Sequence, residues 1–173
     1  IYGGGVYLQE SSPSISGCQI NDNYSSDCGG GISIGYQSSP IITNCQFNDN
    51  ECNPGGGGGV WIMYTSTPSF ENCEIKGNYV PADQGGGVYL TGSSTGTFTS
   101  CLITENIALQ GSGGGIIANS SANAQLLDTT VCANQSGQIS GSWTDLGGNT
   151  VAAECPLIDT NGDGVSDVSD NCD

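Results

Sequence analysis

Short runs of alternating apolar and polar residues recur along the chain, and each run follows three consecutive glycines. Alternation with a period of two predicts a β-strand with one buried face. The first inward column of these strands is expected to be Val6, Ile32, Val60, Val88 and Ile116. The second inward column is Leu8, Ile34, Ile62, Leu90 and Ala118. The residues between the two columns are predicted to face outward: Tyr7, Ser33, Trp61, Tyr89 and Ile117.

A second apolar pattern follows a corner rich in Ser, Thr and Pro, and it predicts a second strand with three inward columns. The first is Ile15, Ile42, Phe70, Phe98 and Leu126; the next is Cys18, Cys45, Cys73, Cys101 and Thr129; the last is Ile20, Phe47, Ile75, Ile103 and Val131. An asparagine stands three residues after the last column in every repeat: Asn23, Asn50, Asn78, Asn106 and Asn134. Asparagine tolerates turn conformations, and its amide can bond to the backbone or to the asparagine of the next repeat.

The glycine triplets recur at intervals of 26, 28, 28 and 28 residues. A fixed period in this range is typical of a solenoid, in which each repeat stacks on the last. No amphipathic helix can be written for the chain. We therefore predict an all-β fold, a right-handed parallel β-helix of about five coils, with equivalent strands about 4.8 Å apart along the axis. The glycines are expected to form tight corners or to pack closely without side chains.

The pattern divides the chain into three parts. Residues 1–135 carry the coils, and the period breaks in residues 136–155. There, apolar residues are expected to lay a degenerate last turn across the open end of the solenoid, which needs a cap. These residues are Ile139, Trp143, Leu146 and Val151. Residues 156–173 form the third part, a loop rich in aspartate.

This last part has the spacing of a calcium-binding loop. Oxygen-bearing side chains fall at positions 1, 3, 5, 9 and 12, and a glycine at position 6 allows a sharp turn. The predicted Ca²⁺ ligands are the side chains of Asp159, Asn161, Asp163, Asp167 and Asp170, together with the backbone carbonyl of Val165. No helical sequence flanks the loop, so it is not expected to belong to an EF-hand pair.

Charge and cysteine content indicate the setting. Lys76 is the only basic side chain against 17 acidic residues, which gives a net charge of −16. Such a surface repels nucleic acid and anionic membranes and attracts divalent cations. No apolar run is long enough for membrane insertion, and nine cysteines favour an oxidising, extracellular compartment. The chain lacks an initial Met and begins within a repeat, so we interpret it as a mature or excerpted piece of a longer product.

The cysteines fall into two groups. Cys18, Cys45, Cys73 and Cys101 share an inward column, and we expect buried thiols because equivalent side chains in parallel coils point the same way. The others are Cys28, Cys52, Cys132, Cys155 and Cys172. Cys28–Cys52 is the favoured disulfide, because these cysteines end successive coils. Cys155 could pair with Cys172 to close the calcium loop, or with Cys132, and one cysteine is left over.

The alternation of Gly-Gly-Val/Ile with Phe/Ile-x-x-Asn, complete in residues 47–50, resembles the repeats of the polymorphic outer-membrane protein family. It also resembles the wider group of bacterial secreted right-handed β-helix proteins, over residues 1 to about 135. This resemblance implies secretion, in a group that includes surface adhesins as well as polysaccharide lyases and hydrolases. The Asp-x-Asn-x-Asp-Gly string that starts at Asp159 is similar to a thrombospondin type 3 calcium repeat.

The composition argues against an enzyme. Without His, no Ser/His/Asp or Cys/His arrangement can form. β-Helix lyases use Arg or Lys, and here Lys76 stands alone beside Glu71 and Glu74; we interpret this group as a solvated acidic face with one ion pair.

We therefore predict a non-enzymatic extracellular structural protein, a calcium-stabilised fibre subunit or surface adhesin. It would stack head to tail into a polymer through open strand edges. The alternative is a carbohydrate-binding or polysaccharide-degrading module. In that case the outward aromatic column of Tyr7, Trp61 and Tyr89 would stack on the sugar rings of a glycan.

Overall fold

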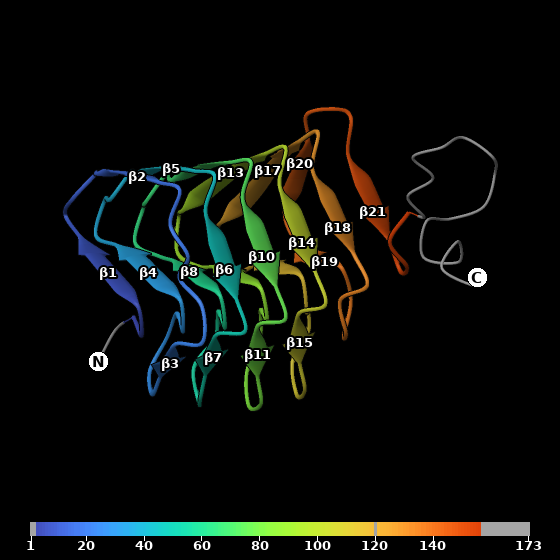
Figure 1. Ribbon diagram of the computed structural model, residues 1–173, viewed down its shortest axis with the longest axis horizontal. Coiled ribbons are helices and arrows are strands. Elements are labelled where there is room, and N and C mark those ends of the chain that lie inside the picture. Colours follow the sequence, from blue (N-terminus) through green and yellow to red (C-terminus); the bar gives the residue numbers. More distant parts are fainter. Residues whose placement is uncertain (1–2, 120, 157–173) are drawn as a thin grey trace, which may run out of the picture.

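Parallel strands stacked along one axis form the structure (Figure 1). The computed structural model describes residues 3–119 and 121–156. The chain passes through up to four strand positions in each repeat, and every described strand pairs in parallel with its equivalent in at least one adjacent repeat. The predicted parallel β-helix is therefore confirmed. Within the described ranges, no helix has the length and apolar character needed to cross a membrane.

The first sheet follows the glycine triplets. Its strands are β1 (Val6–Gln9), β4 (Ile32–Gly35), β8 (Val60–Ile62), β12 (Val88–Leu90), β16 (Ile116–Ala118) and β19 (Ile139–Gly141). The pairing places Val60 opposite Val88 and Ile62 opposite Leu90, and the same register holds along the sheet. The inward columns expected from the alternation are thus the columns that stack.

The segment predicted as one second strand is two strands that meet at a corner. One sheet contains β2 (Ser14–Ser16), β5 (Ile41–Thr43), β9 (Ser69–Glu71), β13 (Thr95–Thr99), β17 (Asn123–Leu127) and β20 (Trp143–Asp145). The next contains β6 (Gln46–Asn48), β10 (Glu74–Lys76), β14 (Leu102–Thr104), β18 (Thr130–Cys132) and β21 (Thr150–Ala152). The single-strand prediction is wrong because the residue before each cysteine is left-handed, as Asn44 is with φ 54°.

A fourth set of strands forms short arms on one side of the coil (Figure 1). These strands are β3 (Tyr24–Ser25), β7 (Glu51–Cys52), β11 (Tyr79–Val80) and β15 (Ile107–Ala108). They form their own four-stranded parallel sheet. At their base, Cys28, Cys52 and Val80 make a small buried cluster against Trp61.

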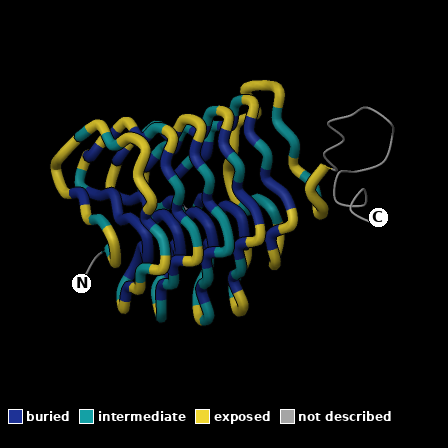
Figure 2. The backbone as a smooth tube through the Cα atoms, viewed as in Figure 1, coloured by how far each residue is buried: buried dark blue, intermediate teal, exposed yellow. Residues whose placement is uncertain are grey.

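The main core runs the length of the coil as stacked apolar columns (Figure 2). The inward columns of the first sheet are fully buried from Ile32 onward, apart from a slight exposure of Ala118. The ring centroids of Phe70 and Phe98 lie 5.0 Å apart in a stacked pair, and Phe47 meets Phe70 edge-on at 6.0 Å. Burial of each such side chain stabilises the fold by about 1.5–3 kcal/mol.

The column expected to face outward on the first sheet is only partly exposed. Ser33 and Ile117 are buried, so the prediction is wrong for these two residues. The reason is the chain that returns from the arms and passes over this sheet. Ser33 Oγ donates a hydrogen bond of 2.9 Å to the Cys28 carbonyl in that returning chain, and a Cβ added at Gly85 would lie 3.0 Å from Ile117.

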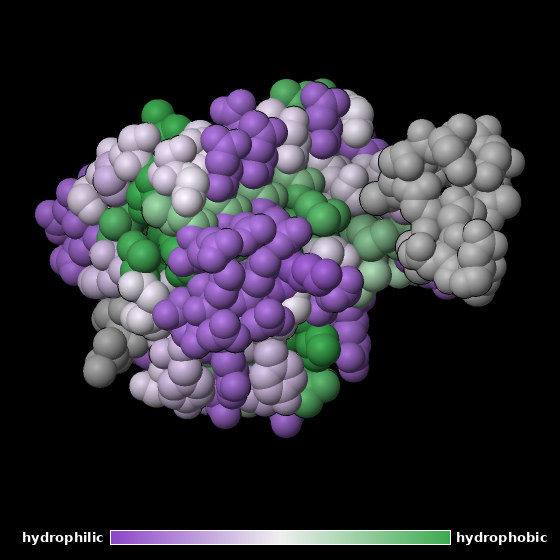
Figure 3. Space-filling model, in the orientation of Figure 1, coloured by the Kyte–Doolittle hydropathy of each residue, from purple (hydrophilic) through white to green (hydrophobic). Residues whose placement is uncertain are grey.

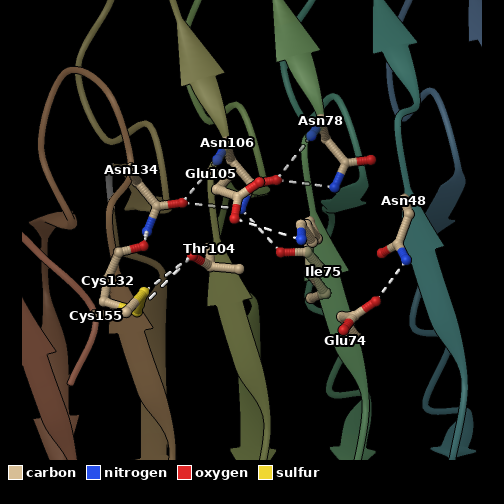
Figure 4. Close-up of polar contacts among 11 residues, drawn as sticks. Asn48, Glu74, Ile75, Asn78, Thr104, Glu105, Asn106, Cys132, Asn134 and Cys155 are labelled. Carbon is tan, nitrogen blue, oxygen red and sulfur yellow. Dashed lines mark hydrogen bonds and ion pairs between the residues drawn. A yellow bond between two sulfur atoms is a disulfide. The ribbon is translucent and has the colours of Figure 1, made fainter. Parts of the chain in front are cut away.

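The asparagine column forms a continuous hydrogen-bonded ladder through the coil (Figure 4). Asn78 Oδ1 accepts hydrogen bonds from the backbone nitrogen and Nδ2 of Asn50, at 2.9 and 3.0 Å. Asn78 Nδ2 donates to the Phe47 carbonyl at 2.7 Å and to Asn106 Oδ1 at 2.9 Å. Both predicted bonding modes are therefore present, and Gln138 Oε1 ends the ladder by accepting from Asn134.

The third glycine of each triplet packs directly against an asparagine of the ladder. A Cβ added at Gly59, the third glycine of its triplet, would lie 2.9 Å from Asn78 Nδ2 and 2.9 Å from the Gly87 carbonyl oxygen. Gly57, the first of the same triplet, has φ 73° and turns the chain into the strand. The glycines therefore serve both as corners and as close packing without side chains, as predicted.

The cysteine column satisfies backbone groups at a corner. Cys45, Cys73 and Cys101 are buried free thiols, as predicted. Cys73 Sγ lies 3.3 Å from the carbonyl oxygen of Glu71, at the end of β9. Thr129 takes the cysteine position in a later repeat, and its hydroxyl makes the equivalent contact with Leu127 at 3.0 Å. The column thus fills space and donates hydrogen bonds, which a hydroxyl does equally well.

Cys18 departs from this pattern because it is exposed. It lies in the first described repeat, so among the described residues only the following repeat packs against it. The expectation of a buried thiol is wrong at this position.

One disulfide joins Cys132 to Cys155, with their Cα atoms 4.9 Å apart. The predicted alternative, in which Cys155 pairs with Cys132, is confirmed. The Cys155–Cys172 pairing is wrong, because Cys155 already has a partner. Cys172 itself lies outside the described residues.

The favoured Cys28–Cys52 disulfide is also wrong, since both residues are free thiols. The Cys28 thiol turns towards Asp27 and donates a hydrogen bond of 3.4 Å to its Oδ1 atom. Burial, with the nearby Asp27 carboxylate, raises the pKa of Cys28 far above its usual range. Burial likewise raises the pKa of Cys52, to about 12.

We expect Asn78→Ala to lower the free energy of unfolding by about 3 kcal/mol, because it leaves several buried donors and acceptors without partners. The same change at Asn23, which is only half-buried, is the matched control and should cost clearly less. Urea denaturation followed by circular dichroism measures both. Equal losses at the two positions would contradict a ladder that depends on burial.

Iodoacetamide at about pH 8 should modify Cys18 in the native protein and leave Cys28 and Cys52 untouched until urea unfolds the chain. The thiolate is the nucleophile, and raised pKa values keep the two buried groups protonated at this pH. Peptide mapping by mass spectrometry identifies each modified residue. Recovery of Cys28 and Cys52 as one linked peptide would contradict the structure.

Candidate functional site

The predicted calcium loop lies outside the described residues. This applies to all six predicted ligands: Asp159, Asn161, Asp163, Val165, Asp167 and Asp170. In residues 3–119 and 121–156, no group of three or more Cys, Asp or Glu side chains is placed to hold a metal ion. The calcium site therefore stays a prediction.

The acidic group around Lys76 is divided between two sheets. Glu71 ends β9 and is exposed, whereas Glu74 lies on β10 and accepts a hydrogen bond of 2.6 Å from Asn48 Nδ2 (Figure 4). Lys76 Nζ pairs at 3.4 Å with Glu105, from the following repeat. Both side chains are largely exposed, so the pair contributes less than about 1 kcal/mol. Hydrophilic side chains cover the middle of this face (Figure 3).

The predicted aromatic column does not form one open platform. Tyr7 is exposed, but the buried Ser33 separates it from Trp61 along the sheet. Trp61 is half-buried against the arm cluster. Tyr89 is half-buried, and its hydroxyl accepts a hydrogen bond of 3.2 Å from Asn119 Nδ2. The structure does not bring these three rings together as a single surface for a ligand.

A different pair of tyrosines lines a groove at the corner between the first and second sheets. The ring centroids of Tyr36 and Tyr64 lie 4.7 Å apart with the planes tilted by 34°. The groove has a volume of about 550 Å³ and is completed by the side chains of Glu10, Ser12, Gln37 and Thr65. It spans three successive repeats, and we call it the corner groove.

The corner places these rings by an unusual backbone conformation. Glu10, Tyr36, Tyr64 and Gly92 are equivalent positions, each two residues after a paired inward residue of the first sheet. All four have positive φ, with 56° at Tyr36 and 51° at Tyr64. Glycine adopts this conformation freely, whereas for a bulky residue it costs on the order of 1–3 kcal/mol. Two repeats therefore carry tyrosine where the fold itself needs only glycine.

The sequence contains a signal for this groove that the alternating pattern does not reveal. The signal is the column two residues beyond Leu8, Ile34 and Ile62, at the end of each strand. Alternation predicts that this column points inward, and the left-handed turn directs it to the outside instead. The corner groove combines stacked rings with amide, hydroxyl and carboxylate groups, which suits a small ligand with both apolar and hydroxylated faces.

The last described coil forms a second candidate binding surface, because several of its apolar side chains are exposed. Strands β19, β20 and β21 each pair with the preceding coil, and no other described strand lies on their far side. Trp143, Leu146 and Val151 are 38%, 48% and 41% exposed. Asp145 orders the turn after β20 by accepting hydrogen bonds from Gly147 at 2.9 Å and Asn149 at 2.6 Å, which lowers the pKa of its carboxyl.

Comparison with protein families agrees with this architecture. A family model described as the right-handed beta helix region matches residues 1–131. Comparison with curated proteins and with solved structures returned no match. The match spans the four sheets up to β18, and it confirms the predicted right-handed turn of the coil. By its sequence and its stacked parallel strands, the chain belongs to the right-handed β-helix family.

Proposed function

We propose that this chain is a non-enzymatic extracellular structural protein, which stacks end to end as a fibre subunit or a surface adhesin. The observation that carries this proposal is the last described coil. Its strands keep the register of the coil beneath, no other described strand pairs with their far edges, and the side chains of Trp143, Leu146 and Val151 are exposed. Such an edge is a template for strand pairing with a second chain.

Stacking of this kind would repeat the contacts already made inside the molecule. Each internal joint joins parallel strands. In the last coil Ile139 continues an apolar column opposite Ile116, whereas Asp145 lies opposite Leu126. A contact between the last coil of one copy and the first coil of another is heterologous, and such contacts build filaments when they do not close into rings. The net charge of −16 opposes stacking at low salt, so divalent cations would favour it.

The extracellular location and the calcium dependence rest on the sequence. Support comes from the resemblance to bacterial secreted β-helix proteins, the aspartate-rich loop of residues 159–170 and the disulfide between Cys132 and Cys155. Disulfides persist mainly in oxidising compartments. The disulfide fixes Cys155 to β18, and in the sequence the predicted calcium loop follows Cys155.

Trp143→Asp should weaken self-association at least about tenfold, because it places a charge where an apolar side chain would be buried between copies. Tyr24→Asp, which alters a more exposed ring on an arm, is the matched control and should assemble as the unchanged protein does. Sedimentation velocity and negative-stain microscopy give the assembly state. Monomers at every concentration in calcium, or assembly undiminished by Trp143→Asp, would overturn the proposal.

Calcium should raise the thermal midpoint of the full chain, since a ligand that binds only the folded state stabilises it. Asp163→Asn removes one predicted ligand charge and should weaken Ca²⁺ binding about tenfold or more in isothermal titration calorimetry. Asp22→Asn removes one charge from an exposed corner of the coil and serves as the control. If both variants bind Ca²⁺ equally well, the loop is not the site.

A further inference from the structure

The corner groove lies along the side of the first three repeats, and its proposed role does not depend on end-to-end stacking. Tyr64 is half-exposed, and Tyr36 lies against one side of it. The equivalent residue of the next repeat is Gly92, which places no side chain beside the ring on its other side. One face of the tyrosine pair is thereby left accessible to a flat apolar partner.

Packing does not explain the two tyrosines. Both rings lie outside the core, and both residues hold a left-handed backbone that glycine adopts without strain at the equivalent position 92. In addition, the side chains of Glu10 and Gln37 make no hydrogen bond to any other described residue, although they line the same groove. These amide and carboxylate groups are available to a ligand.

We propose that the corner groove binds neutral sugar residues of a glycan chain. The apolar face of a pyranose ring would stack on Tyr64, which matches the preference of aromatic rings for C–H groups above their negative face. Hydroxyl groups of neighbouring residues in the glycan chain would bond to Gln37 and Glu10, which line the same groove in the second and first repeats. Ser12 and Thr65 add hydroxyl groups along the groove.

Charge determines which glycans fit. Among the described residues that line the groove, Glu10 alone is charged, and the chain as a whole carries a net charge of −16. An acidic polysaccharide would have to approach this field with no basic side chain to receive its carboxylates, since Lys76 lies on β10 in another sheet. The groove therefore selects neutral sugars and rejects uronates.

The test is titration of the full chain with a panel of soluble oligosaccharides: cello-, xylo-, manno- and galacto-oligosaccharides as neutral probes, and oligogalacturonate as the acidic probe. At least one neutral probe should bind. Tyr64→Gly should reduce its affinity about tenfold or more through loss of stacking. Because glycine relieves the left-handed backbone, the urea midpoint of this variant should equal or exceed that of the unchanged protein.

Tyr24→Gly, which removes an exposed ring from an arm, is the control and should leave the affinity unchanged. Salt should have little effect on binding, since neither the ring nor a neutral sugar is charged. The proposal is overturned if no neutral probe binds, if Tyr64→Gly binds as tightly as the unchanged protein, or if oligogalacturonate binds more tightly. Failure of end-to-end assembly would not affect it.

Discussion

The ladder of buried asparagines is the interaction on which the rest of the structure depends. Each side-chain amide in this ladder bonds to the backbone of the preceding repeat and to the asparagine of the next repeat. Every repeat must therefore stack in one register. A slip of one residue would leave buried amide groups without partners, which is far more costly than a shift within an apolar core. The glycine triplets exist in their present form because a side chain at Gly59 would collide with this ladder.

This constraint divides the chain into residues that build the coil and residues that are free to do something else. The inward columns, the asparagines and the glycines are committed to stacking. The corners and the coil ends are less constrained, and both functional proposals lie there. Trp143 belongs to the last coil, and the Tyr36–Tyr64 pair belongs to a corner where the backbone needs only a left-handed residue.

Sequence reasoning succeeded where one residue type recurs for a local physical reason. It located the inward columns, the asparagine bonding and the role of the glycines. It failed where a single left-handed residue changes direction: Asn44 separates two strands that alternation joins, and Tyr36 turns outward where alternation points inward. It also failed where distant segments meet, since the chain returning from the arms buries Ser33 and Cys28 turns to Asp27 instead of Cys52.

The sequence by itself determined the solenoid, because a period of 28 residues with constant columns permits one parallel stacking. It also determined the charge of the molecule and the spacing of the calcium-type loop. Only the tertiary structure decided which aromatic rings are accessible and which of the described cysteines pair. These properties depend on how corners turn and on which segments lie over one another, and neither is encoded in the repeat itself.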